Sequence, residues 1–191
     1  MGSSPSKFKG DNNPVEQVSW YDAIYFCNKL SKKFGYTPVY EVDGKTDVTT
    51  WNYTPHKSNS IGGKVTQNTS ADGFRLPTTE EWEYAARGGQ NYTYSGSDNL
   101  DEVGWYEDNS GNRTHPVAQK KSNGYGLYDM SGNVWEWCWD VYPYDRNGRH
   151  CHYRSGGYYI YDRGCLVDRR YEDDAGHQYN GLGFRIVCNS D

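Results

Sequence analysis

The stretch that decides the fold is residues 124–137, which read Gly-Tyr-Gly-Leu-Tyr-Asp-Met-Ser-Gly-Asn-Val-Trp-Glu-Trp. It ends in Trp135 and Trp137, two of the 7 tryptophans of the chain, all of which occur at or before Trp139. The 191 residues are only 35% hydrophobic but 16% aromatic, with 19 Tyr, whereas disordered chains are poor in aromatic residues. We therefore expect one domain over residues 1–191, with a core built largely from indole rings.

Composition excludes several classes of protein. The net charge of −5 and the lack of a basic block argue against a nucleic-acid partner. No apolar run approaches the roughly 18 residues of a membrane-spanning helix. Residues 1–10 begin Met-Gly-Ser-Ser and are expected to be a tag or linker remnant. The chain has five cysteines: Cys27, Cys138, Cys151, Cys165 and Cys188. Because no two of them form a C-x-x-C motif, no zinc site is indicated. Because their number is odd, a complete disulfide framework is not indicated either.

Two helices are predicted from their start signals. Ser19 is an N-cap candidate with Asp22 at the capping-box position, and Gly35 is the stop after an apolar face of helical period. The second helix begins at Thr78, where Glu81 completes a T-x-x-E capping box, and it ends at a Gly-Gly pair. The rest of the chain is expected to form short strands and loops, because turn residues interrupt it every few positions.

Four stretches together resemble the formylglycine-generating-enzyme (sulfatase-modifying factor) family. They are residues 14–23, residues 74–89, residues 124–137 and Gly183-Phe184-Arg185. The resemblance covers nearly the whole chain and implies an α+β protein with the C-type lectin fold. It further implies two helices, small twisted antiparallel sheets, many loops, and N- and C-terminal strands that pair.

The oxidases of this family use a C-x4-C cysteine pair roughly 16 and 21 residues before the Gly-Phe-Arg, where two thiolates bind copper. Here Cys165 lies 18 residues before Gly183, and Ile160 stands five residues earlier. A second branch uses iron held by three histidines and a separate helical domain, and this chain has only 5 His. We therefore assign no catalytic residue and do not expect an enzyme.

Metal sites are weighed at two places. His150 and His152 would share one face of a strand, but no third ligand follows, so an exposed polar stretch is favoured over a metal there. Some relatives carry a structural calcium near Asn133 and Glu136, where Asp140 is a further oxygen donor. The favoured alternative is that Glu136 pairs with a buried polar partner. No other cofactor is expected, and the E-P-N and Q-P-D tripeptides of sugar-binding lectins are absent.

Residues 140–182 differ in composition from the rest of the chain. They contain no Lys, Trp or Met, while Tyr, Asp, Arg, Gly, His and Asn crowd together. These residue types fit codons that end in a pyrimidine, and only Glu172 and Gln178 depart from that alphabet. Randomising the adenines of AAC or AAT codons would generate it.

This pattern is similar to the variable proteins of diversity-generating retroelements, which place adenine-mutagenised codons in a C-type lectin-fold C-terminus. The resemblance implies a non-enzymatic display protein with 140–182 as its variable ligand-binding region. Tyr suits such a surface, as in antibody paratopes, because it gives a large amphipathic contact area at low entropy cost. One exposed ligand-contact face is predicted, with Tyr158 among its surface tyrosines and these contact residues: Tyr159, Ile160, Tyr161, Asp162, Arg163, Asp168, Arg169, Tyr171, Asp173, Asp174, His177, Tyr179 and Asn180.

The display interpretation carries further expectations. The ligand is expected to be a protein, and the chain a monomer that binds no nucleic acid and does not itself span a membrane. The location is expected to be the cell surface or outer membrane, with lipid anchoring through a segment outside this sequence. Two alternatives remain: a divergent oxidase of the formylglycine-generating type, and an interaction domain with one fixed partner.

Overall fold

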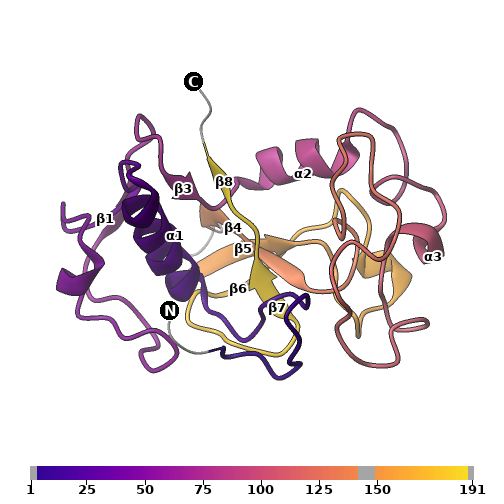
Figure 1. Cartoon of the computed structure of the whole chain (residues 1–191), viewed down its shortest axis with the longest axis horizontal. Coiled ribbons are helices and arrows are strands. Elements are labelled where there is room, and N and C mark those ends of the chain that lie inside the picture. The colour runs from indigo at the N-terminus through magenta and orange to yellow at the C-terminus, as the bar shows by residue number, and fades with distance from the viewer. Residues whose placement is uncertain (1–3, 142–148, 189–191) are drawn as a thin grey trace.

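The structure is a computed structural model that describes residues 4–141 and 149–188. Its centre is a four-stranded sheet formed by β4 (Trp135–Val141), β5 (His150–Arg154), β6 (Tyr171–Asp174) and β7 (Leu182–Phe184). The strand order is β6-β5-β4-β7, so β6 and β7 lie at opposite edges. Figure 1 shows α1 to the left of this sheet, α2 above it and long loops with α3 to the right.

The two predicted helices are present with their predicted caps. α1 (Trp20–Phe34) has the Ser19–Asp22 capping box and ends at Gly35 with φ 80°. α2 (Thr79–Arg87) has the capping box of Thr78 and Glu81. These local signals work because the first backbone N–H groups of a helix have no partner within it, so a nearby side chain must accept from them.

A third helix was not predicted. α3 (Leu100–Val103) spans four residues, and the side chain of Asn99 accepts from the Asp101 N–H at its start. One helical turn is too short to show an apolar period, so the sequence carries no pattern for it. Two 3₁₀ turns, η1 (Val48–Thr50) and η2 (Asp162–Gly164), escape prediction for the same reason.

Two small antiparallel pairs complete the sheets. β1 (Tyr40–Val42) pairs with β2 (Val65–Gln67), and β3 (Phe74–Arg75) pairs with β8 (Val187–Cys188). Within the central sheet β4 and β7 are parallel. The sheets are therefore small, as expected, but not antiparallel throughout.

The expected pairing of N- and C-terminal strands is not found in residues 4–141 and 149–188. The N-terminal segment closes into a loop, because Glu16 N donates to Ser6 Oγ and Glu16 Oε1 accepts from Phe8 N. Gln17 N, at the end of this segment, donates to Tyr179 O in the C-terminal part at 3.1 Å. Ser6 is buried and Phe8 packs edge-on against a tyrosine ring, so these two positions of the presumed tag or linker belong to the packed structure.

The core confirms the prediction from the tryptophans. Trp51, Trp82 and Trp137 are all 1% exposed or less. Two of the core indoles donate to backbone carbonyls, Trp137 Nε1 to Val18 O at 3.0 Å and Trp20 Nε1 to Cys138 O at 2.9 Å, whereas the buried Trp105 Nε1 has no partner among the described residues. Such pairing lets large amphipathic rings fill a core without leaving a donor unsatisfied.

Candidate ligand-binding face at the edge of the sheet

The predicted contact residues lie around β6, the edge strand of the central sheet. β6 pairs with β5 in the register Tyr153↔Tyr171 to His150↔Asp174. None of the thirteen predicted residues is buried. Seven are exposed: Tyr161, Asp162, Arg163, Asp168, Arg169, Tyr171 and His177. Six are half-buried: Tyr159, Ile160, Asp173, Asp174, Tyr179 and Asn180.

A buried framework holds the loop between β5 and β6. Arg154 donates to Val167 O at 3.1 Å and pairs with Glu83 of α2 at 3.0 Å. Gly156 has φ +81°, and a Cβ there would lie 2.5 Å from Cys165 Sγ. The loop is thus anchored at its start and its end by contacts that do not involve the exposed side chains.

Tyr158 corrects the prediction for the surface tyrosines. Its side chain is only 4% exposed, its carbonyl accepts from Ser110 Oγ at 2.6 Å, and its ring meets Phe8 with centroids 5.2 Å apart. Tyr158 belongs to the framework because the N-terminal loop covers it. Because Phe8 and Tyr158 lie far apart in the chain, no pattern in the sequence around Tyr158 predicts this contact.

Aromatic rings connect the segment around η2 with β6. The Trp135 ring lies edge-on to the Tyr153 and Tyr171 rings, each at 5.1 Å, and these two tyrosines stack at 6.1 Å. On its other side Trp135 approaches Gly164 of η2. Trp135 therefore bridges η2 and β6.

Two tyrosines extend this cluster toward residues 179–181. Burial raises the pKa of Tyr179 far above its ordinary value, and the neighbouring Tyr153 and Tyr159 act in the same direction. Burial likewise raises the pKa of Tyr159 to about 12. Gly181 lies directly against the Tyr159 ring, where a Cβ would come within 2.3 Å. The Tyr159 and Tyr179 hydroxyls therefore stay protonated at neutral pH, where they donate and accept hydrogen bonds but carry no charge.

The charged residues divide into two groups. Asp173 pairs with His177 at 2.5 Å, and Asp174 Oδ1 accepts from Gly176 N at 2.8 Å, which fixes the turn after β6. Across the described residues, no ion pair holds the side chains of Arg163, Asp168 or Arg169. These three present charge to solvent.

Two neighbouring residues were missed by the sequence analysis. Tyr153 belongs to the aromatic cluster, and its cross-strand position opposite Tyr171 could have been found only by knowing the register. Glu172 is exposed on β6 between two predicted contact residues. It was passed over because its codon departs from the restricted alphabet, which says nothing about exposure.

At the opposite edge of the sheet, Glu136 is fully engaged by protein donors. Its carboxylate receives two hydrogen bonds from Arg185, at 2.6 and 2.7 Å, and one from Trp82 Nε1 at 2.6 Å. Asn133 uses its side chain on the His115 backbone, and Asp140 accepts from Thr79 N. These contacts match the favoured alternative, a buried polar pairing of Glu136. The calcium site stays a prediction.

The remaining metal and thiol candidates are equally constrained. His152 is 6% exposed, so the expected exposed stretch is wrong for this residue, since β5 lies inside the sheet while His150 stays exposed. Within residues 4–141 and 149–188 no group of three or more His, Cys, Asp or Glu could hold a metal ion. Burial raises the pKa of Cys165 to about 12, which keeps it a neutral thiol. No helix of the described chain is long and apolar enough to cross a membrane.

Comparison with known proteins defines the class. Residues 1–190 match the family described as the sulfatase-modifying factor enzyme 1-like domain, and the chain belongs to this family. Its α+β fold is accordingly that of the formylglycine-generating-enzyme and C-type lectin-like proteins.

Individual relatives show the range of that family. The chain is 48% identical over 160 residues to the chaperone protein LppX of Paenibacillus barcinonensis, covering 73% of this chain and 56% of the relative. It is 33% identical over 150 residues to the formylglycine-generating enzyme of Streptomyces coelicolor, covering 62% and 48%. It therefore spans about half the length of these relatives. Among solved structures, Treponema denticola variable protein 1 superposes with a TM-score of 0.86 at 37% identity, covering 98% of this chain and 78% of that one.

Proposed function

We propose that this chain is a non-enzymatic ligand-binding display protein whose C-terminal region is diversified by a retroelement. One observation carries the proposal: the region with the restricted residue alphabet supplies thirteen unburied side chains around one sheet edge, while four of the residues between them are buried, namely Gly164, Cys165, Val167 and Ala175. Likeness to a variable protein at a TM-score of 0.86 supports it.

The chemistry of the face suits protein ligands. Tyr161 is 66% exposed and Tyr171 41% exposed, and both can bury large ring areas against a partner. The uncommitted charges of Arg163, Asp168 and Arg169 can complement charges on the ligand. We further propose a monomer displayed at the cell surface by an anchor outside this sequence, which protease treatment of intact cells and light scattering of the purified chain would test.

The decisive experiment is to sequence this locus in sister isolates and to map the changes onto the structure. Retroelement diversification predicts substitutions confined to the thirteen face positions and absent from Arg154, Tyr158 and Cys165. It also predicts a reverse-transcriptase gene and a near-copy of the 3′ end nearby. Changes spread evenly over the chain would contradict the proposal.

The 48% identity to a protein named as a chaperone favours one second candidate, a domain with a single fixed partner. The same experiment separates the two. A fixed-partner domain predicts that Tyr161, Arg163 and Arg169 are invariant among isolates, because each would contribute to one interface.

A further inference from the structure

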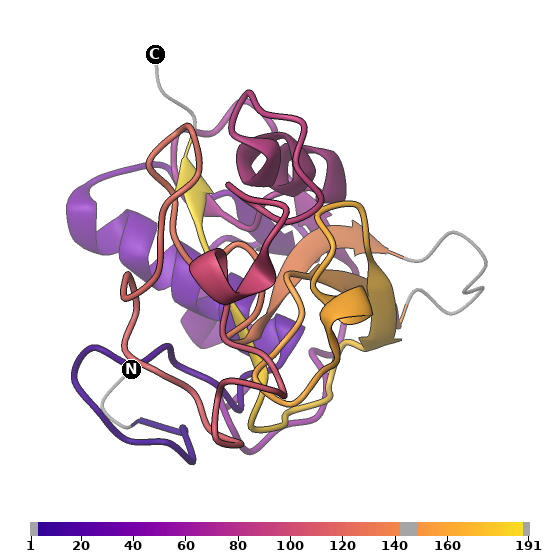
Figure 2. The ribbon, with the colours of Figure 1, turned by 90° about the vertical axis from the view of Figure 1, so that its right-hand side faces the viewer.

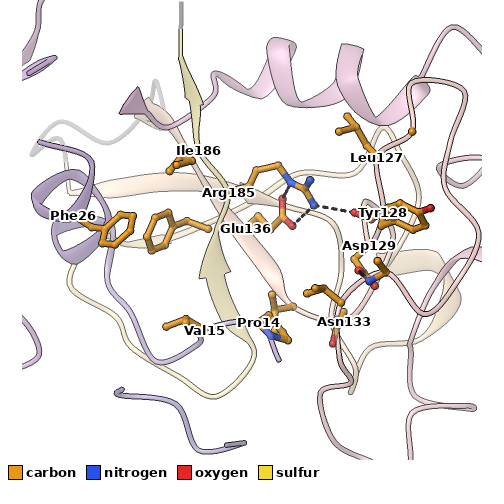
Figure 3. Close-up of a pocket in the computed structure, with 15 residues that line it drawn as sticks. Pro14, Val15, Phe26, Leu127, Tyr128, Asp129, Asn133, Glu136, Arg185 and Ile186 are labelled. Atoms are coloured by element: carbon orange, nitrogen blue, oxygen red, sulfur yellow. Dashed lines mark hydrogen bonds and ion pairs between the residues drawn. The ribbon is translucent and has the colours of Figure 1, made fainter. Parts of the chain in front are cut away.

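A cavity of about 430 Å³ lies at the end of the central sheet where β4 ends and β5 begins, at the right of Figure 2. Its volume is within the usual range for small-molecule sites. It shares no residue with the thirteen predicted contact residues. It also differs from a larger cavity at the β7 edge, where Glu136 and Arg185 are already paired with each other (Figure 3). The smaller cavity instead contains donors to which the described residues offer no acceptor.

The base of this cavity is apolar and buried. Trp20 of α1, Ile61 and Ala175 line it, and each of them is 7% exposed or less. The other walls come from the segment that leads into β2, from the end of β4 and from the start of β5. A flat apolar group that enters the cavity would be removed from water against this base.

The indole of Trp139 provides the first uncommitted donor. Trp20 and Tyr40 stack on its ring, with centroids 5.2 and 5.0 Å apart, so the ring edge is the part left to line the cavity. Within residues 4–141 and 149–188 its Nε1 has no hydrogen-bond partner, and unlike Trp105 Nε1 it is not buried. The edge of an aromatic ring is its positive part, so it attracts negative charge.

The hydroxyl of Tyr21 provides the second donor. Tyr21 lines the cavity and is half-buried, and its hydroxyl has no hydrogen-bond partner in the part of the chain that the structure describes. Burial raises the pKa of Tyr21, and Cys151 and Arg149 lie close enough to influence that pKa as well. Both of these residues line the cavity, which places the hydroxyl end of Tyr21 there. The hydroxyl stays protonated at neutral pH and can donate to a ligand.

The charged lining of the cavity is cationic. Lys64 and Arg149 line it, and no described Asp or Glu does. Lys64 is exposed, and its ammonium group forms no ion pair with any described residue. Two carboxylates near the lining already accept hydrogen bonds, Asp174 from Gly176 N at 2.8 Å and Asp43 from Lys64 N at 2.9 Å. A cleft lined by charge of one sign attracts ligands of the opposite sign.

We propose that this cavity is a binding site for a small aromatic carboxylate. The carboxylate accepts from the Tyr21 hydroxyl and from Trp139 Nε1. Lys64 and Arg149 supply the positive charge that draws it in. The aryl group lies on the apolar base beside Trp20. This site is additional to the proposed display function, because it uses none of the predicted contact residues.

The test is a titration of the full chain with 2-naphthoate, followed by calorimetry and by amide shifts in the NMR spectrum. Saturable binding is expected, with shifts at Ile61, Lys64 and Cys151. The neutral analogue 2-naphthamide should bind about tenfold more weakly, because a hydrogen bond to a neutral acceptor is weaker than one to a carboxylate. The cation 2-naphthylmethylammonium should not compete, since like charges repel.

Two variants and one control complete the test. Tyr21→Phe keeps the ring but removes the hydroxyl, and it should weaken 2-naphthoate binding about tenfold. Lys64→Gln removes a charge at an exposed position that the fold does not depend on, and it should weaken binding about threefold. Lys33→Gln is the matched control, because it makes the same change on an exposed residue at the opposite end of α1 from Tyr21. It should bind 2-naphthoate as the unaltered chain does.

Three outcomes would overturn the proposal. They are the lack of saturable 2-naphthoate binding, unchanged affinity in both cavity variants, and binding of 2-naphthamide as tight as that of 2-naphthoate. Tyr161→Ala, at the β6 edge, should leave the affinity for 2-naphthoate unchanged. Each overturning outcome can occur whether or not the β6 edge binds a ligand, so this test is independent of the proposed display function.

Discussion

The two edges of the central sheet differ in how their charged side chains are paired. At the β7 edge, Glu136 satisfies Arg185 and Trp82 at once, and the three side chains lock β4, α2 and the end of the chain together. At the β6 edge, Arg163, Asp168 and Arg169 face solvent without an ion pair among the described residues. This difference predicts that substitutions in the paired cluster cost more stability than substitutions of the exposed side chains at the β6 edge. The predictions below test this division, from the largest effect to the smallest.

The largest loss is expected for Glu136→Ala. It leaves the Arg185 guanidinium and the Trp82 N–H without their acceptor, and breaking a buried pair from one side costs about 3–5 kcal/mol. Chemical denaturation measures the free energy of unfolding. Glu136→Gln, which retains a neutral acceptor, should lose less; equal losses in the two variants would show that the acceptor contributes nothing without the charge.

A smaller loss in the free energy of unfolding is expected for Gly156→Ala, in the loop that follows β5. Its positive φ and the approach of a Cβ to Cys165 Sγ should together cost about 2–3 kcal/mol. Gly126→Ala is the matched control, because its φ is +75° but no atom lies within 4 Å of its Cβ; it should cost about 1 kcal/mol. If both variants lost the same amount by thermal melting, packing at Gly156 would not contribute.

The third effect is a pH dependence at the β7 edge. Burial raises the pKa of Asp129 above its ordinary value of 3.8, so the folded state holds this proton more tightly than the unfolded state. The stability contributed by protonated Asp129 is therefore present at low pH and is lost as pH rises from about 3.8 through the raised folded pKa. Asp129→Asn should be relatively less stable than the unaltered chain at low pH and gain on it as pH rises. A constant difference between the two chains from pH 3 to 8 would refute this.

The smallest effects are expected at the β6 edge. Tyr161→Ala, Asp168→Ala and Arg169→Ala should each change the free energy of unfolding by less than about 0.5 kcal/mol, since their side chains are exposed. Tyr179→Ala is the contrasting variant, because its half-buried ring packs into the core and should cost more than 1 kcal/mol. Losses at the three exposed positions as large as at Tyr179 would mean that the face also supports the fold.

Local patterns predicted much of this molecule because their physics is local. The caps at Ser19 and Thr78 require only a side chain within three residues of an unpaired N–H, so spacing alone identified them. The favoured interpretation of Glu136 was a buried polar pairing, and Arg185 and Trp82 are its partners. The restricted composition after residue 140 marked a region whose predicted contact side chains are all at least partly exposed.

Long-range contacts explain where prediction failed. Tyr158 was expected on the surface and is buried, because Phe8 approaches it from 150 positions away in the chain. The resemblance implied an N-terminal strand that pairs with the C-terminal one, but the hydrogen bond from Glu16 N to Ser6 Oγ closes the N-terminal segment into a loop. Neither contact has a periodic signal, since each joins residues brought together only after the chain has collapsed.

The sequence by itself determined the two capped helices and the indole-rich core, and its family motifs implied the α+β class. The caps could be predicted because they depend on near neighbours, and the indole core because it follows from composition. Only the tertiary structure decided that β6 and β7 lie at opposite edges, that Trp135 bridges η2 and β6, and that Asp129 is buried. Burial and strand order are properties of the packed chain, because they depend on which distant segments exclude water from each side chain.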